Sequence, residues 1–114
     1  MYGKFVIARS RNQGVVCGYL VSVSGASCTL EDARQIHYWS GEAPNGQQVR
    51  TCFELAEWGA GNARISVAVT EILMTEICGV ILCTDTSEAN LRQSRWNAFF
   101  DRSISCPPRK KRSV

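Results

Sequence analysis

The chain has 114 residues, of which 45% are hydrophobic and 20% charged, as expected for one small globular domain. No apolar run approaches the roughly 20 residues that cross a membrane, and the first ten residues contain too short an apolar stretch for a secretory signal. Composition therefore excludes a membrane-spanning helix and predicts a cytoplasmic protein.

The net charge of +3 comes from the end of the chain. Residues 109–112, RKKR, hold four of the thirteen basic residues, so residues 1–108 carry nine basic against ten acidic residues. This body lacks the basic surface of a nucleic-acid-binding protein. Because two prolines before RKKR end regular structure, we expect a globular domain over 1–106 and a basic tail over 107–114. The tail is either a solvated terminus or an arm that seeks phosphate groups.

The six cysteines form no C-x-x-C pair, and one histidine, His37, is too few for a Cys/His metal cluster. Free cysteine packs as a small hydrophobic residue in a reducing compartment. We therefore expect no metal, no cofactor and no disulfide framework. Four cysteines lie in apolar runs: Cys17, Cys28, Cys78 and Cys83.

The first third of the chain predicts a β-meander, with strands over residues 4–9, 15–24 and 26–32. Gly18 inside the second strand indicates a bulge or a close approach of two backbones. Ser24-Gly25 is a two-residue hairpin signal.

Residues 33–39 alternate in the period of a fourth strand. One side would carry Ala33, Gln35, His37 and Trp39, and the other Arg34, Ile36 and Tyr38. We expect the stretch 29–41 to form an edge strand, with Trp39 or Ile36 packed inward.

A change of period over residues 47–58 predicts the first helix, which ends at Gly59. Its apolar face would comprise Val49, Cys52, Phe53 and Ala56. Residues 63–84 are strand-like again, although 70–77 fit a strand or a helix equally well.

A second helix is predicted from Asp85, which would cap it in a capping-box-like Asp85-x-x-Glu88 start. Glu88 and Arg92 would form an i, i+4 pair, and Trp96 and Phe100 would share a face. The predicted fold class is α+β: a mainly antiparallel sheet with one inserted helix and one C-terminal helix.

Ligand binding is the chemistry that the residues favour. A guanidinium group pairs with phosphate, and an aromatic ring stacks on a nucleobase. Each of these side chains also has a structural alternative, a surface salt bridge for an arginine and sheet packing for an aromatic ring. The candidates are Arg9, Arg11 and Asn12 after the first strand, Arg34, Tyr38 and Trp39 in the fourth, and Asn90 and Arg92 on the second helix.

Catalysis is not favoured, because the chain has no G-x-S-x-G elbow, no P-loop and no G-x-G-x-x-G loop. Glu31 and Asp32 are adjacent, so on a strand they would face opposite ways. We expect a protein that is not an enzyme.

Three segments resemble a family of small phage-encoded proteins that includes the anti-Thoeris sponges. They are FVIARSRNQGVVCGYLVS, TLEDARQIHYWSG and TEI-x-x-TEI followed by ILCT, and they span most of residues 4–84. The order and spacing of these segments are similar to the family pattern. The helix after Cys83-Thr84 departs from it.

The resemblance implies a protein that sequesters a cyclic ADP-ribose-type immune signal intact, in the host bacterial cytoplasm. It also implies a homo-oligomer, dimeric or hexameric, with pockets between subunits. Some members of the family also hold cyclic oligonucleotides. By approximate position, Asn90 and Arg109 would bind the ligand and Arg34 would line a pocket.

Two alternatives remain open. One is a phage inhibitor that binds a host defence complex or a nucleic-acid enzyme directly, through its acidic body or its basic tail. The other is a cysteine-dependent enzyme that uses His37 with one of the six thiols.

Overall fold

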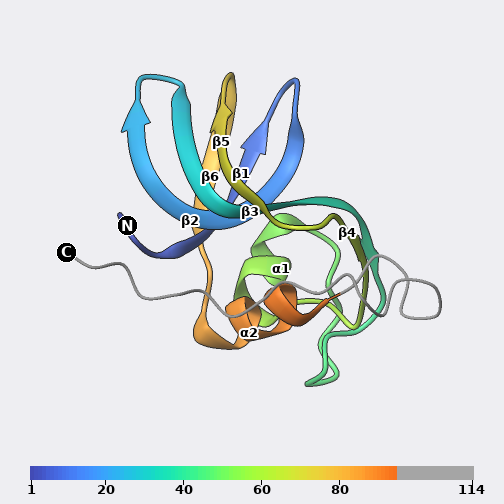
Figure 1. The fold of residues 1–114 in the computed structure, drawn as a ribbon. Helices are drawn as coiled ribbons and strands as arrows, with labels where there is room; N and C mark the ends of the chain where they lie inside the picture. Colours follow the sequence, from blue (N-terminus) through green and yellow to red (C-terminus); the bar gives the residue numbers. More distant parts are fainter. Residues whose placement is uncertain (95–114) are drawn as a thin grey trace.

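A computed structural model of the chain describes residues 1–94 and confirms the α+β fold class (Figure 1). This part of the chain forms six strands and two helices. In chain order they are β1 (Phe5–Ser10), β2 (Gly14–Ser24), β3 (Ser27–Ser40), α1 (Cys52–Trp58), β4 (Asn62–Ile65), β5 (Val69–Met74), β6 (Ile77–Leu82) and α2 (Asp85–Gln93). No helix among these residues is long and apolar enough to cross a membrane.

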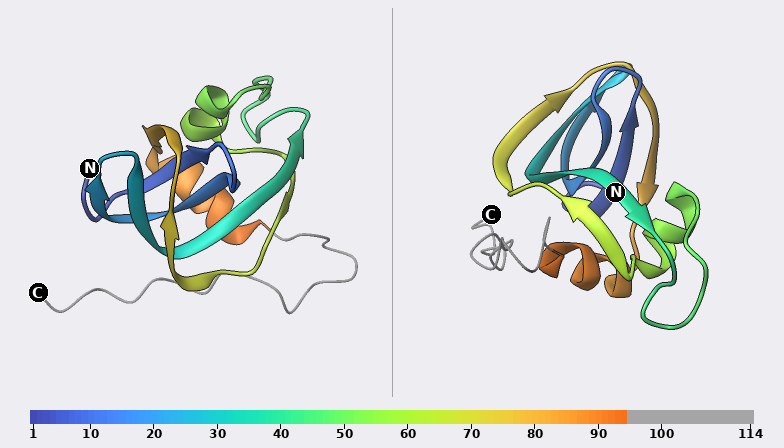
Figure 2. Two further views of the ribbon diagram at one scale, coloured as in Figure 1. Left: turned by 90° about the horizontal axis from the view of Figure 1, so that it is seen from above. Right: turned by 90° about the vertical axis from the view of Figure 1, so that its right-hand side faces the viewer.

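The strands form one antiparallel sheet in the order β4-β3-β2-β1-β6, and β5 pairs with the first half of β3 beside β4. The long strands β2 and β3 bend strongly, so the sheet curls into a partly closed barrel (Figures 1 and 2). The helices α1 and α2 lie together at the lower end of this barrel in Figure 1.

Two hydrophobic cores lie on the two faces of the sheet because side chains alternate along each strand. Val6 and Ala8 of β1 belong to the inner core of the barrel, together with Leu30 and Met74. Phe5 and Ile7 belong instead to the outer core, which the helices cover through side chains that include Leu55 and Leu91. The same strands therefore support both cores.

The prediction of separate strands over 26–32 and 33–39 was wrong, because both stretches belong to β3. The two halves join at Asp32, whose φ of 49° bends the strand without ending it. The prediction of an edge strand was also wrong. β3 lies inside the sheet, between β2 on one edge and β4 and β5 on the other.

A register shift between Ile36 and Tyr38 interrupts the predicted alternation of β3. Because a bulge adds one residue to a strand, it reverses the facing of the residues that follow. Ile36 and Trp39 therefore both pack against the outer core, whereas Tyr38 is half exposed.

Gly18 confirms the predicted close approach of two backbones. A Cβ atom at this position would lie 2.9 Å from the Glu31 carbonyl oxygen and 3.1 Å from the Ala33 Cα. The β2–β3 hairpin forms one residue later than predicted, since Ser24 still pairs with Ser27 and the turn is Gly25-Ala26.

The first helix is shorter than predicted, because Thr51 caps it. The Thr51 side chain accepts a hydrogen bond from the Phe53 N–H, and Glu54 completes a capping box. Val49 consequently lies before the helix, and Phe53 is 71% exposed while Leu55 is buried. Gly59 ends the helix as predicted, with φ of 77°.

The second helix is capped by Thr84 rather than Asp85. The Thr84 hydroxyl accepts a hydrogen bond from the Ser87 N–H, and Asp85 lies in the first turn. The ambiguous stretch 70–77 resolves into the end of β5, a turn and the start of β6. Trp96 and Phe100 lie outside the described residues.

Candidate ligand-binding site

A cavity of about 420 Å³ lies at the side of the barrel, where the β1–β2 turn faces β5. Segments from distant parts of the sequence form it: the turn, the start of β2, the middle of β3, the residue after β4, and β5. The lining side chains are Asn12, Gln13, Val16, Ala33, Gln35, Ser66, Val69 and Ile72.

The floor of the cavity is apolar. Val16 and Ala33 are buried members of the inner core, and Ile72 packs against the same core. Val69 is 46% exposed, so it lies toward the mouth. The floor therefore offers aliphatic contact to a flat or hydrophobic part of a ligand.

Gln13 forms the wall between the β1–β2 turn and β5. Its Nε2 donates to the Leu73 carbonyl over 3.2 Å, and its Oε1 accepts from the Thr75 N–H over 2.8 Å. Asn12 supports this wall, because its Nδ2 donates to the Thr75 hydroxyl over 3.3 Å. The carboxamide of Gln13 thus bonds to the edge of β5 as the peptide group of a neighbouring strand would.

Gln35 and Ser66 form the opposite wall. The backbone groups of Gln35 bond to the Ser66 N–H and hydroxyl, at 2.9 and 2.8 Å. The Gln35 side chain extends across to donate from Nε2 to the Gln13 carbonyl over 3.0 Å. Amide groups of β3 and of the β1–β2 turn thereby meet at the rim.

Among the lining residues that the structure describes, none carries a charged side chain. Positive charge is close to the rim nevertheless. Arg11 is exposed and directly precedes Asn12, whereas Arg9 shares the outer face of β1 with Phe5 and Ile7. The site therefore combines an uncharged chamber with one basic side chain on the adjoining turn.

The structure places the predicted site residue Arg34 in the protein interior, where it is 1% exposed. Its Nε donates to the Ser66 carbonyl over 2.7 Å, and its Nη1 donates to the carbonyls of Leu91 and Arg92 over 2.8 and 3.1 Å. Arg34 thus joins the wall of the cavity to the C-terminal end of α2, and it does not present a guanidinium fork at the surface.

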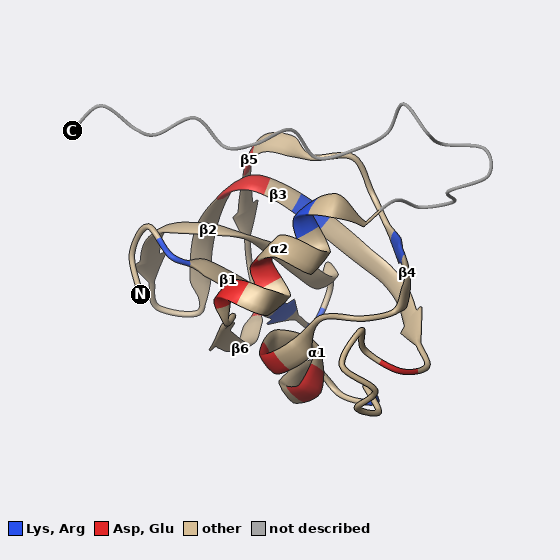
Figure 3. Ribbon diagram, turned by 90° about the horizontal axis from the view of Figure 1, so that it is seen from below, with Lys and Arg blue, Asp and Glu red and all other residues tan. Residues whose placement is uncertain are grey.

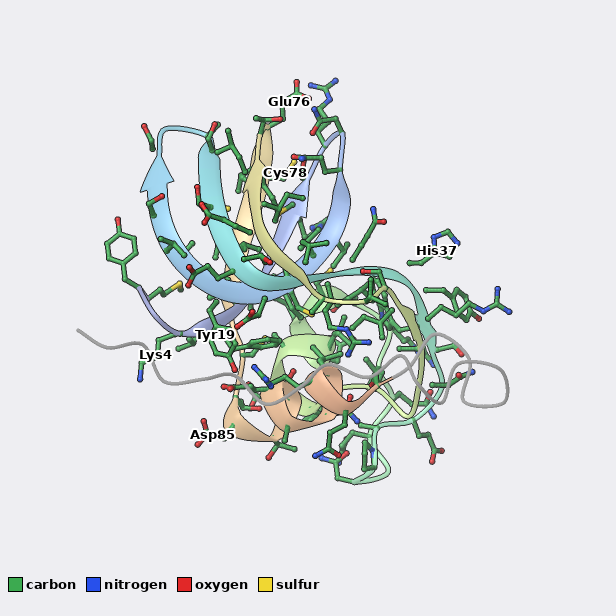
Figure 4. The ribbon with its side chains drawn as sticks, in the orientation of Figure 1. Lys4, Tyr19, His37, Glu76, Cys78 and Asp85 are labelled. Atoms are coloured by element: carbon green, nitrogen blue, oxygen red, sulfur yellow. The ribbon has the colours of Figure 1, made fainter. Side chains whose placement is uncertain are left out.

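The structure does not bring Tyr38 and Trp39 to the cavity. Tyr38 is exposed on β3, and the guanidinium carbon of Arg64 lies 5.9 Å from the centre of its ring. Trp39 packs against the outer core. The neighbouring His37 projects away from the barrel (Figure 4).

Asn90 and Arg92 hold the helices in place. Asn90 exchanges two hydrogen bonds of 2.9 Å with the backbone of Ala60, beyond the end of α1. Arg92 donates to the Tyr19 hydroxyl and lies over the Tyr19 ring, with its guanidinium carbon 5.3 Å from the ring centre. Arg109 lies outside the described residues.

The Tyr19 hydroxyl joins β2 to α2 beneath the sheet (Figure 4). It donates to Glu88 Oε2 over 2.7 Å, so Glu88 and Arg92 meet at this hydroxyl. Burial, with a smaller contribution from the hydrogen bond to Glu88, raises the pKa of Tyr19 to about 12. The neutral tyrosine is therefore the form that the folded protein holds.

Comparison with known proteins assigns a family to this chain. Residues 3–91 match the family model described as Domain of unknown function (DUF6948). The chain belongs to this family. The match spans every residue that lines the cavity. Searches of curated proteins and of solved structures found no match.

Among the described cysteines of this DUF6948 domain, Cys78 is exposed, and the others, Cys17, Cys28, Cys52 and Cys83, are buried. Burial raises the pKa of the Cys28 and Cys52 thiols, and that of Cys83 to about 12. A raised pKa keeps a thiol protonated and poorly nucleophilic. In the described part of the domain, no three His, Cys, Asp or Glu side chains gather as metal ligands.

Of the predicted site residues that the structure describes, only Asn12 lines the cavity of the DUF6948 domain, and Arg11 directly precedes it in the sequence. Sequence reasoning missed Gln13, Gln35 and Ser66, although the turn signal at residues 12–14 and the alternation over 33–39 include the first two. Nothing in the spacing of these residues indicates that they meet.

Proposed function

We propose that this protein binds a nucleotide-type signal molecule in the cavity and sequesters it without cleaving it. The resemblance of the sequence to the anti-Thoeris sponges supplies the ligand class, a cyclic ADP-ribose-type nucleotide. The corresponding role is that of a phage anti-defence protein in the host bacterial cytoplasm, binding as a homo-oligomer.

The cavity is the observation that supports this proposal. Its volume of about 420 Å³ falls within the roughly 300–1,000 Å³ of small-molecule sites, which are mostly apolar with a few placed polar groups. A nucleobase is flat and uncharged and has hydrogen-bonding edges. Its faces match the aliphatic floor, and its edge matches the amide of Gln35.

An exposed basic side chain of the β1–β2 turn suits the charged part of the same ligand. Phosphate groups pair with guanidinium groups, and Arg11 is exposed next to the rim residue Asn12. The proposal assigns the base to the chamber and the phosphates to Arg11. Sequestration needs affinity rather than proton transfer, so an uncharged chamber suffices for it.

A thermal-shift screen against cyclic ADP-ribose isomers and cyclic di- and trinucleotides tests the proposal. A ligand that binds only the native state raises stability by about 4 kcal/mol at a thousandfold excess over Kd. We expect one ligand class to raise Tm, Gln35→Leu to abolish the shift, and Gln47→Leu in an exposed loop to retain it. The ligand should be recovered unchanged after denaturation. Turnover, or a shift that survives Gln35→Leu, contradicts the proposal.

A second candidate, inhibition by direct binding to a host protein, is favoured by the surface of the helices. Phe53 is 71% exposed on α1, and both α1 and α2 carry acidic residues (Figure 3). An exposed aromatic side chain is a common anchor of protein interfaces. This candidate predicts that no nucleotide raises Tm. It also predicts that Phe53→Ser abolishes inhibition of the host protein, whereas Gln35→Leu retains it.

A further inference from the structure

The outer surface of α1 carries an exposed aromatic ring. Phe53 is 71% exposed, although phenylalanine is among the residues that are most often buried. Glu57 is exposed four residues later, so the two side chains share one face of the helix. This face is different from the one that packs on the outer core, which comprises Cys52, Leu55 and Ala56.

The start of α2 places a further carboxylate beside this face. The Thr84 hydroxyl donates to the Glu57 carbonyl over 2.6 Å, so Asp85, the next residue, lies close to the C-terminal end of α1. Asp85 is exposed and points away from the barrel at its lower end (Figure 4). The sequence of α1 has no lysine or arginine, and that of α2 has only Arg92, in the last turn (Figure 3). We call Phe53, Glu57 and Asp85 the helix patch.

The charge of the chain is divided between the described domain and the C-terminal segment. Residues 1–94 hold seven basic and nine acidic residues, whereas residues 95–114 hold six basic residues and one acidic residue. Four of these six form the run 109–112, directly after Pro107 and Pro108. The most basic part of the chain is therefore opposite in charge to the helix patch.

The order of residue types over 107–112 also fits the helix patch. Proline-rich segments dock on exposed aromatic rings, and an ammonium or guanidinium group is attracted to the face of such a ring. Beside Phe53, the carboxylates of Glu57 and Asp85 can pair with the cations that follow the prolines. The carbonyl groups at the C-terminal end of a helix favour a nearby cation as well, and Glu57 lies in the last turn of α1.

The chain is long enough for this contact to form within one molecule. α2 ends at Gln93, and at 1.5 Å per residue its start at Asp85 is about 12 Å away. Thirteen residues, 94–106, connect α2 to Pro107. They can span up to about 45 Å, so residues 107–112 can return along α2 to its start.

We propose that residues 107–112 dock on the helix patch of the same molecule, with the prolines against Phe53 and the basic run against Glu57 and Asp85. The basic run then contacts the helices of its own domain rather than a phosphate group. A host partner that used Phe53 as an anchor would have to displace the segment. The helix patch contains no residue that lines the cavity, so this inference does not depend on the ligand of the cavity.

A spin label on Cys106, directly before the docking segment, tests the contact in the full chain. Cys78→Ser removes the exposed cysteine of the described domain, and mass spectrometry checks that each chain carries one label, on Cys106. In nuclear magnetic resonance spectra, the label should broaden the amide signals of Glu57 and Asp85. Glu76, at the opposite end of the barrel (Figure 4), should keep its signal. The broadening should weaken at about 1 M salt, where charges interact over only about 3 Å.

Charge reversal tests the role of the carboxylates. Glu57→Lys combined with Asp85→Lys should abolish the broadening at these two amides. Replacing all four residues of 109–112 by glutamate in that background should restore it, because the charges of both partners are then exchanged. Glu71→Lys combined with Glu76→Lys is the matched control, since it changes the net charge equally at exposed positions outside the helix patch. This control should retain the broadening.

A mixed sample distinguishes contact within one molecule from contact between copies. It combines isotope-labelled chains that lack the spin label with spin-labelled chains that lack the isotope, and we expect no broadening in it. Circular dichroism checks that each variant is folded. Equal signals of Glu57, Asp85 and Glu76 with and without the label overturn the proposal. Broadening that survives reversal of the helix patch, or that appears in the mixed sample, also overturns it.

Discussion

At the scale of single residues, Gly18 controls the distance between β2 and β3. A Cβ atom there would lie 2.9 Å from a backbone oxygen, which cannot move without shifting the strand. We expect Gly18→Ala to lower the free energy of unfolding by about 1–3 kcal/mol, as overpacking does. Urea denaturation measures this loss. Gly79→Ala is the control, because nothing lies within 4 Å of its Cβ position. An equal loss in both variants would contradict the steric explanation.

Arg34 is the second residue whose replacement should strongly lower the stability of the fold. Its guanidinium donates to carbonyl groups of two segments, Ser66 after β4 and the end of α2. We expect Arg34→Met to cost about 2–4 kcal/mol, because buried carbonyls lose their charged donor. Arg34→Lys should recover only part of the lost stability, since one ammonium group does not reproduce the several donors of the planar guanidinium group. Exposed Arg64 is the control, and chemical denaturation of Arg64→Met should show a loss below about 1 kcal/mol.

Tyr19 gives the fold a pH dependence in the alkaline range. Its pKa rises from 10.0 to about 12 on folding, so the folded state favours the neutral phenol. Its contribution to stability is complete below pH 10 and is lost as pH rises through 12. We expect Tm to fall less steeply above pH 10 in Tyr19→Phe than in the wild type. Tyr2→Phe, at an exposed position, should keep the wild-type slope. If Tm falls with the same slope above pH 10 in all three proteins, Tyr19 is not the source of the alkaline pH dependence.

At the scale of elements, the sequence predicts strands well and their junctions poorly. Apolar and β-branched runs identify β1 and β2, which are largely buried on both faces, and the period of two identifies strand stretches that bury one face. It does not reveal that β3 continues through Asp32, whose positive φ turns the chain within a strand. It also misses the bulge before Tyr38, since one inserted residue leaves the local composition unchanged. Cap geometry, rather than periodicity, sets the start of α1 at Cys52.

The hairpin β1–β2 and strand β5 depend on Gln13 for their contact. Its carboxamide accepts from the Thr75 N–H and donates to the Leu73 carbonyl. We expect Gln13→Ala to speed hydrogen exchange at the Thr75 amide and to lower stability by about 1 kcal/mol. Gln47→Ala, in an exposed loop, should leave exchange at Thr75 unchanged. Unchanged protection of Thr75 in Gln13→Ala would show that the backbone alone holds this contact.

At the scale of the whole molecule, the cavity escapes prediction because it depends on how the sheet curls. Its walls come from residues as distant in sequence as Gln13 and Ser66. Gln13 lies in the predicted turn, whereas Ser66 lies in a stretch predicted as strand but follows the end of β4. Their proximity follows from the bend of β2 and β3. The same limit explains why Arg34 was expected to line a ligand pocket, although it is buried beneath α2. A strand pattern does not tell which face a helix will cover.

The two cores should unfold together, because β1, β2 and β3 contribute side chains to both. Leu30 is buried in the inner core, and Leu55 in the outer core. We expect Leu30→Ala and Leu55→Ala each to cost about 2–5 kcal/mol. In a two-state transition, every probe reports the same midpoint.

Tryptophan fluorescence distinguishes cooperative from separate unfolding, since Trp39 and Trp58 both pack against the outer core. A Trp96→Phe background removes the third tryptophan, which lies outside the described residues. In that background, Leu30→Ala should shift the fluorescence midpoint in urea although no tryptophan contacts the inner core cluster. It should shift the far-ultraviolet circular dichroism midpoint equally. A fluorescence midpoint that stays in place while the dichroism midpoint falls would mean that the barrel interior unfolds separately from the layer of helices.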